Sequence, residues 1–170
     1  MLDVSGKTAF ITGGASGMGW GMAKAFAEAG MKVVIADIRQ DALDEAMDGF
    51  SKTNLAVHAV KLDVTDRDGW VKAADEAEAQ FGNIHVLCLN AGVGGGGLVQ
   101  DMTYKDWDFG LGVNIGGVVN GLVTMLPRML KHGEEGHIVT TSSTGGFSAV
   151  GGVSVYCTAK FAVAGMMETV

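Results

Sequence analysis

The sequence predicts an α/β fold in which one doubly wound parallel sheet carries helices on both faces. Short apolar runs alternate with stretches of helical hydrophobic spacing along nearly the whole chain, and this alternation is typical of repeated strand–helix–strand units. With 170 residues, 48% of them apolar and 18% charged, the chain has the size and composition of a globular domain. We therefore expect residues 1–170 to form a single domain.

The first half of the chain supplies three of the expected strands. Residues 8–12 are a short apolar run, followed by a glycine-rich turn and a helix that Gly30 stops. Residues 32–36 form the second strand, residues 40–52 have helical spacing, and residues 55–62 alternate like a third strand.

The second half repeats the pattern with longer helices. Thr65 is expected to cap a helix, and residues 84–89 form the fourth strand. A glycine-rich loop and a long apolar helix, from about residue 104 to 131, lead to the fifth strand at 138–141. The chain ends in a last helical run.

Charge and composition exclude several function classes. The formal net charge is −7, and no Lys/Arg cluster marks a nucleic-acid surface. Cys88 and Cys157 lack metal-site or disulfide spacing, so we expect two reduced packing residues and no metal. No secretory signal begins the chain, and no apolar run reaches the roughly 18 residues of a membrane span. The chain is therefore expected to be cytoplasmic and not bound to a membrane.

The turn after the first strand is suited to a pyrophosphate. Residues 12–19 read T-G-G-A-S-G-M-G, and glycines permit a tight turn with close backbone approach to a ligand. The helix that follows offers unpaired N–H groups and the positive end of its dipole. The predicted contacts are Gly13, Ser16, Gly17, Met18 and Gly19. A glycine-rich turn can also serve packing alone, and this spacing differs from G-x-G-x-x-G.

Acidic residues at the ends of the second and third strands indicate which dinucleotide would bind. Asp37 could accept hydrogen bonds from an adenosine ribose and would repel a 2′-phosphate. Ala15 supplies no cation there and Arg39 is the one counter-signal, so the pattern favours NAD over NADP. Asp63 and Val64 would lie at the adenine, although either carboxylate is also compatible with a solvated strand end.

The last helical run carries the candidate acid/base. Tyr156 and Lys160 are four residues apart and share one helix face, where a nearby ammonium favours the phenolate. Ser143 lies thirteen residues before Tyr156, after the fifth strand, at the edge of a parallel sheet where ligands bind. Tyr-x-x-x-Lys alone favours an exposed helix face, but the three residues together favour a reactive site.

The combined motifs resemble the short-chain dehydrogenase/reductases over essentially the whole chain. The residues that carry the resemblance are Thr12-Gly-x-x-x-Gly17-x-Gly19, Asp63-Val64, Asn90-Ala91-Gly92, Asn114, Ser143 and Tyr156-x-x-x-Lys160. The resemblance implies a Rossmann-type, NAD(P)-dependent oxidoreductase that interconverts secondary alcohols and ketones by hydride transfer.

The same resemblance implies a role for each site residue. Tyr156 would exchange the proton of the substrate hydroxyl, while Lys160 would favour its phenolate and bind the nicotinamide ribose. Ser143 would hold the substrate oxygen, and Asn114 would bind a water that links Lys160 to solvent. Asn90, Ala91 and Gly92 would lie against the cofactor.

Two further expectations follow from the resemblance. Residues 106–114 and 136–147 are similar to bacterial members that act on bulky aryl secondary alcohols, including Cα-dehydrogenases of lignin-derived ethers. The apolar helix at 104–131 is expected to take part in a homodimer or homotetramer.

The chain ends at Val170, before the sixth and seventh strands and the substrate-covering segment of such enzymes, so we expect a domain that is incomplete at its C-terminus. The alternative function is a dinucleotide-binding fragment without turnover. A methyltransferase would share the glycine-rich turn but leaves Ser143, Tyr156 and Lys160 unexplained.

Overall fold

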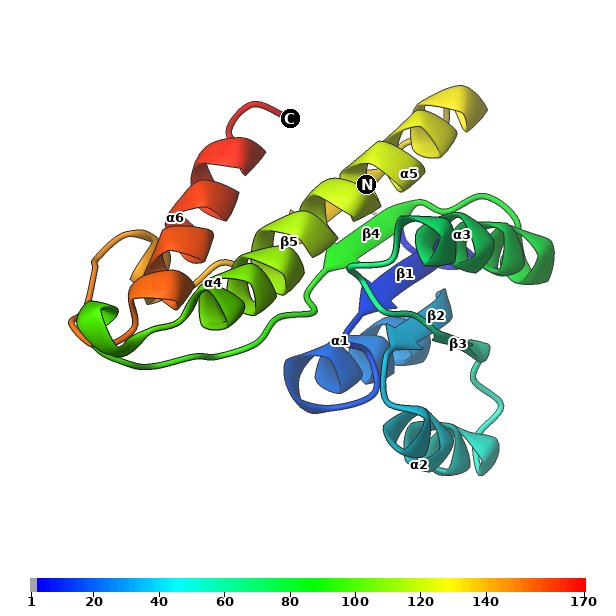
Figure 1. Ribbon diagram of the computed structural model, residues 1–170. Coiled ribbons are helices and arrows are strands. Elements are labelled where there is room, and N and C mark those ends of the chain that lie inside the picture. Colours follow the sequence, from blue (N-terminus) through cyan, green and yellow to red (C-terminus); the bar gives the residue numbers. More distant parts are fainter. Residues whose placement is uncertain (1–2) are drawn as a thin grey trace.

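The computed structural model describes residues 3–170, and these residues form one five-stranded parallel sheet in the order β3-β2-β1-β4-β5 (Figure 1). The strands are β1 (Thr8–Thr12), β2 (Lys32–Asp37), β3 (Val57–Lys61), β4 (Val86–Leu89) and β5 (His137–Thr140). The helices are α1 (Gly17–Glu28), α2 (Gln40–Ser51), α3 (Arg67–Phe81), α4 (Tyr104–Leu111), α5 (Gly117–His132) and α6 (Ser154–Met167). The predicted Rossmann-type sheet is confirmed.

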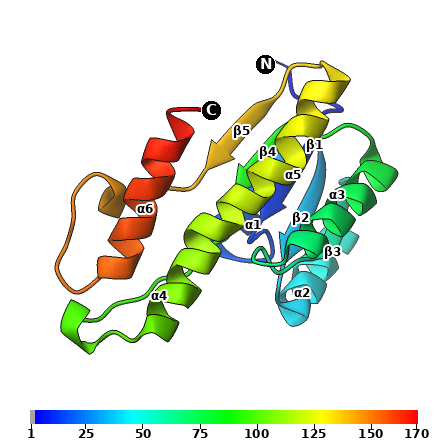
Figure 2. The same cartoon turned by 45° about the horizontal axis from the view of Figure 1, so that its top comes forward.

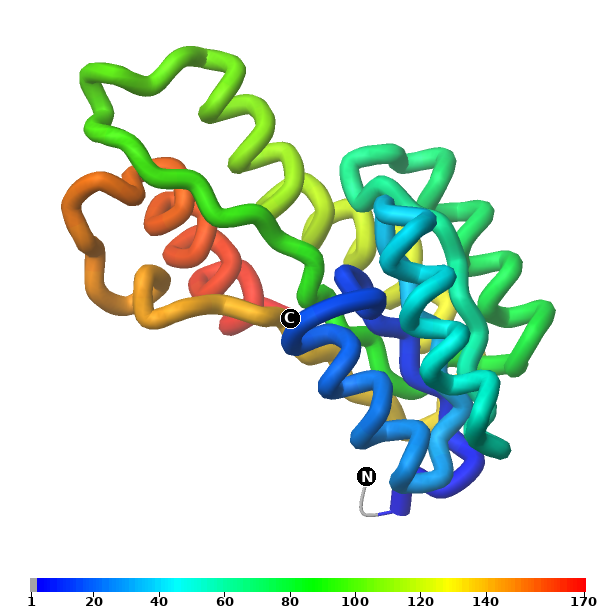
Figure 3. The backbone as a smooth tube through the Cα atoms, turned by 90° about the horizontal axis from the view of Figure 1, so that it is seen from below, coloured from blue at the N-terminus to red at the C-terminus, as the bar shows by residue number. Residues whose placement is uncertain are grey.

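Helices cover both faces of the sheet. On one side, Ile11 of β1 packs in a cluster with α1 and α2; on the other, Phe10 joins a cluster with α3 and α5 (Figures 1 and 3). Neighbouring residues of β1 point to opposite faces, and all five are buried, because a parallel strand between two helical layers has no solvated face. Phe10 contacts Trp70 of α3 with ring centroids 5.8 Å apart.

The expected helix boundaries hold except at one cap. Gly30 follows α1 with φ +85, the left-handed conformation that only glycine adopts cheaply. At α3 the prediction of Thr65 as the cap is wrong. The N-cap is Asp66, whose side chain accepts the Asp68 N–H, while Thr65 donates both its N–H and its hydroxyl to Asp63. Two adjacent residues could each cap the helix, and the turn after β3 selects the second.

The strands are somewhat shorter than the predicted apolar runs. β3 lies at one edge of the sheet and, among the described residues, pairs only with β2, from Val57 to Lys61. β4 begins at Val86 rather than at residue 84. β5 forms the other edge, with Val139 47% exposed (Figure 2).

Both cysteines are free and buried, and burial raises the pKa of the Cys88 thiol to about 11.

The long predicted helix is continuous from Tyr104 to His132, with a π-helical turn at Gly112–Gly116 between α4 and α5. At 29 residues it has the length and composition of a membrane span, so the expectation that no segment reaches that range was wrong. The core helix of a soluble fold meets the same criterion, and here Leu122 and Met125 are buried in the cluster beneath the sheet.

Candidate active site

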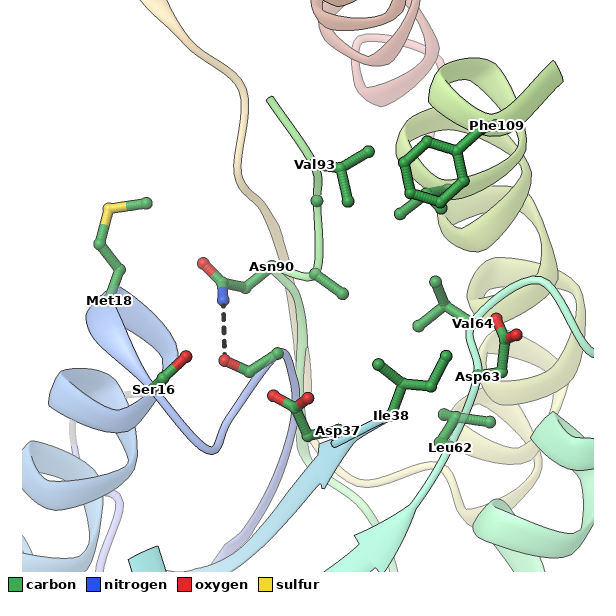
Figure 4. Close-up of a pocket in the computed structure, with 14 residues that line it drawn as sticks. Ser16, Met18, Asp37, Ile38, Leu62, Asp63, Val64, Asn90, Val93 and Phe109 are labelled. Atoms are coloured by element: carbon green, nitrogen blue, oxygen red, sulfur yellow. Dashed lines mark hydrogen bonds between the residues drawn. The ribbon is translucent and has the colours of Figure 1, made fainter. Parts of the chain in front are cut away.

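The predicted site residues gather at the carboxyl ends of the strands. The strand order β3-β2-β1-β4-β5 changes direction between β1 and β4. The loops that follow these two strands therefore lead to opposite halves of the sheet, and parallel α/β folds bind ligands at such a point. A cavity of about 420 Å³ opens there (Figure 4). Its lining includes predicted contacts from four loops, namely Gly13, Ser16, Met18, Asp37, Asp63, Val64, Asn90, Ala91 and Gly92.

The turn before α1 is shaped for an anion. Gly13 and Gly17 have φ +62 and +52, and a methyl group at Gly19 would overlap the Gly13 carbonyl, so each of these positions requires glycine. Ser16 is the N-cap of α1 but makes no capping hydrogen bond with its side chain. The first N–H groups of α1 therefore stay available to a phosphate. These residues fit a dinucleotide.

Two carboxylates, one at the end of β2 and one after β3, line the same cavity. Asp37 accepts the Ala15 N–H through Oδ2 at 3.3 Å and the Arg39 N–H through Oδ1 at 3.1 Å. Asp63 is held by Thr65 through Oδ1 at 2.9 Å. Figure 4 shows both carboxylates with Ile38 between them. Backbone contacts thus orient an acceptor pair suited to ribose and adenine groups.

Asn90 connects three strands at the centre of the site. Its amide nitrogen donates to the Gly13 carbonyl at 3.4 Å (Figure 4) and to the Thr12 carbonyl at 3.1 Å. Its Oδ1 accepts from the Thr141 hydroxyl at 3.0 Å. Thr12 Oγ1 accepts the N–H groups of Asn90 and Ala91 at 2.9 and 3.0 Å. The sequence analysis named Thr12 only as part of the glycine-rich motif and assigned no role to Thr141. The Thr141 contact depends on the pairing of β5 with β4, which exists only in the folded sheet.

Lys160 and Tyr156 face a second cavity of about 430 Å³, which adjoins the first at Met18 and Asn90. Lys160 is 4% exposed, and its Nζ donates to the Thr141 carbonyl at 2.7 Å and lies 5.6 Å from the centre of the Tyr156 ring. Burial lowers the pKa of the Lys160 ammonium. The two residues share one helix face, as predicted.

Asn114 is buried in the π-helical turn and reaches the loop after β4. Its Nδ2 donates to the carbonyls of Val93 and Gly110, each at 3.0 Å, and its Oδ1 accepts the Val93 N–H at 3.1 Å. The side chain therefore fixes the loop that carries Gly92 and also borders the Lys160 cavity. Its water-relay role stays a prediction.

The structure places Ser143 beside the second cavity rather than in its lining. Ser142 lines that cavity, while Ser143 Oγ accepts the Gly145 N–H at 3.1 Å. A methyl group at Gly145 would lie 3.5 Å from Tyr156 Cε1 and 3.6 Å from Ser143 Oγ. Ser143 and Tyr156 thus both lie beside Gly145.

A third cavity, of about 470 Å³, continues from Tyr156 between α4 and the glycine-rich loop. Its lining includes Met102, Phe109 and Val155, which sequence reasoning did not single out because apolar residues give no chemical signal. The loop at 94–97 borders this cavity, and Gly97 donates to the Gly152 carbonyl at 2.7 Å. This contact draws the loop toward the start of α6.

Comparison with known proteins agrees with this geometry. The model of the short chain dehydrogenase family matches residues 7–170. The chain belongs to the short chain dehydrogenase family. This family member is 46% identical over 169 residues to a C alpha-dehydrogenase of Sphingobium sp. (strain NBRC 103272 / SYK-6), covering 99% of this chain and 55% of that protein.

Solved structures of relatives have the same fold. The apo form of LigO from Sphingobium sp. strain SYK-6 has a TM-score of 0.98 at 52% identity, covering 99% of this short chain dehydrogenase and 63% of that chain. A short chain dehydrogenase/reductase from Burkholderia phymatum, crystallised in complex with NAD, has a TM-score of 0.97 at 37% identity. The match covers 99% of this chain and 60% of that chain. The chain thus spans 55–63% of the length of these three relatives.

Proposed function

We propose that this chain binds NAD and interconverts a secondary alcohol and a ketone, with Tyr156 as the acid/base. The observation that carries the proposal is the position of Tyr156 and Lys160. They share one face of α6 and line a cavity that adjoins the first cavity at Met18 and Asn90. NAD, bound there, would accept the hydride of the alcohol, and its reduced form would return a hydride to the ketone.

The chain's own residues would bind, orient and move a proton. Phosphates would lie on the free N–H groups at the start of α1, and Asp37 would accept from the adenosine ribose. The Lys160 ammonium, held by the Thr141 carbonyl at 2.7 Å, would favour the Tyr156 phenolate. Tyr156 Oη would then take the proton of the substrate hydroxyl. Ser143 would donate to the substrate oxygen, and Asn114 would connect Lys160 to solvent through water.

We further propose a bulky aryl alcohol as the substrate. A 46% identical relative is named a C alpha-dehydrogenase, and the cavity beside Tyr156 is lined by Phe109, Met102 and Val155. Aromatic and apolar side chains of this kind favour an aromatic ligand. A cytoplasmic location is proposed because both cysteines are free, and a homodimer or homotetramer is proposed on the resemblance given above.

A second candidate is dinucleotide binding without turnover. It is favoured by the open edge at β5, where Val139 is 47% exposed, and by the 55% coverage of the C alpha-dehydrogenase. The residues expected to contact the pyrophosphate and the adenosine precede residue 93, so they could act without the remaining length of the relatives.

The test is to mix the protein with NAD and a panel of aryl and aliphatic secondary alcohols and follow the near-ultraviolet absorbance of the reduced nicotinamide. Tyr156→Phe is the matched control, because it removes the reactive hydroxyl and keeps the ring. We expect reduction that falls at least ~100-fold in the variant, with NAD affinity unchanged. Binding without reduction would support the second candidate, and no NAD binding would refute both.

A further inference from the structure

An ion pair between Arg39 and Asp41 lies beside Asp37, at the edge of the first cavity. Arg39 follows Asp37 by two residues and is the N-cap residue of α2. Asp41 lies in the first turn of that helix. Resting on NAD as the proposed cofactor, we propose that Asp41 makes the chain selective for NAD over NADP by holding Arg39 away from the ribose 2′ position.

The pair has two-point geometry. Arg39 Nη2 donates to Asp41 Oδ2 at 2.6 Å, and Arg39 Nε donates to Asp41 Oδ1 at 3.3 Å. A guanidinium joined to both oxygens of one carboxylate has a defined orientation. The edge of the guanidinium formed by Nε and Nη2 is therefore already occupied by Asp41.

The backbone keeps Arg39 near the ribose subsite. The Arg39 N–H donates to Asp37 Oδ1 at 3.1 Å, and Asp37 lines the cavity. Asp41 is the main cause of the raised Arg39 pKa, while Asp37 and Glu45 add to it through space. The guanidinium therefore lies within the field of three carboxylates, and Asp41 alone bonds it directly.

The consequence concerns discrimination between two cofactors that differ by one phosphate. A 2′-phosphate would meet the Asp37 carboxylate, and the cation that could offset that repulsion is held by Asp41. Since both partners are more than half exposed, at 63% and 72%, the pair is easily broken by substitution and needs no change in the core. Asp41 is thus a specificity-determining residue that does not touch NAD.

The experiment measures Kd for NAD and for NADP by calorimetry at low ionic strength, without substrate. Asp41→Asn keeps the side-chain shape and releases Arg39. Asp44→Asn is the matched control, because it makes the same charge change one turn along α2, where Asp44 accepts from Gln40. Arg39→Ala and the Arg39→Ala/Asp41→Asn double variant complete the cycle.

We expect Asp41→Asn to tighten NADP binding by about two- to fivefold, the range of an exposed ion pair, with NAD affinity unchanged. The gain should vanish in the Arg39→Ala background and in Asp44→Asn. If Asp41→Asn tightens NADP binding equally with and without Arg39, the cause is charge repulsion by Asp41, and the inference is overturned. If Asp41→Asn leaves NADP binding unchanged while NAD binds normally, the inference is overturned but the proposed cofactor is not. Failure of the unaltered chain to bind NAD would refute the proposed cofactor as well.

Discussion

A methyl group at Gly110 should disturb both the packing and the site. Gly110 is buried where α4 meets α6, and a Cβ there would overlap Cγ1 of Val155. That placement is roughly an ångström inside an ordinary carbon–carbon contact. Val155 is 2% exposed and β-branched, so its side chain has little freedom to move aside. The helices must then separate slightly.

The magnitude follows from two opposed effects. Overpacking of this kind costs about 1–3 kcal/mol, whereas replacing a helical glycine with alanine gains about 1 kcal/mol. Gly110→Ala should therefore be destabilised by up to about 2 kcal/mol. Gly21→Ala is the matched control, since Gly21 is exposed within α1 and a Cβ there meets nothing within 4 Å. The control should be stabilised by up to about 1 kcal/mol.

Urea unfolding measures both free energies, and the two variants should differ by about 1–3 kcal/mol. Because Asn114 donates to the Gly110 carbonyl at 3.0 Å, NAD binding should weaken in Gly110→Ala but not in Gly21→Ala. Adding Val155→Ala should restore part of the lost stability, so that the two changes are less than additive. Equal stability of the two glycine variants would refute the reasoning.

Two other predictions concern contacts outside α4. Thr12→Val removes the acceptor of the Asn90 and Ala91 N–H groups and should cost about 2–4 kcal/mol of unfolding free energy, whereas Thr12→Ser should restore most of it. Glu134, bonded by Lys7, Asn83 and His85, has its pKa lowered from 4.5 to about 2, chiefly by Lys7. It therefore stabilises the fold above about pH 4.5 and loses this effect as the pH falls toward 2.

Unfolding curves across this acid range check the second prediction. Glu134→Gln should be less stable than the unaltered chain at neutral pH and less sensitive to acid between pH 4.5 and 2, and added salt should reduce the difference because the carboxylate is exposed. Identical acid profiles would show that Glu134 is not linked to folding. For Thr12, loss of stability in the serine variant equal to that in valine would rule out the hydroxyl as the cause.

Local patterns in the sequence were sufficient for much of the fold. The alternation of strands and helices predicted the parallel sheet, because apolar periodicity depends on neighbours a few residues apart. Gly30 ended α1 as expected, since a positive φ is a property of one residue. The four-residue spacing of Tyr156 and Lys160 likewise placed both side chains on one helix face.

Tertiary structure decided the contacts that hold those residues in place. Lys160 is held by the carbonyl of Thr141, and every residue has such a carbonyl, so no sequence signal marks it. The same holds for Asn114, which clamps the backbone of Val93 from a π-helical turn. It also holds for the choice of Ser142 over Ser143 as a cavity-lining residue.

The sequence by itself therefore determined which chemical groups are present and the secondary structure that carries them, because these depend on local spacing and side-chain type. Only the folded sheet brought Thr12, Asn90 and Thr141 together across three strands. The separation along the chain between Thr12 and Asn90 is 78 residues. Contacts at such separations arise from the packing of whole elements, which no local pattern encodes.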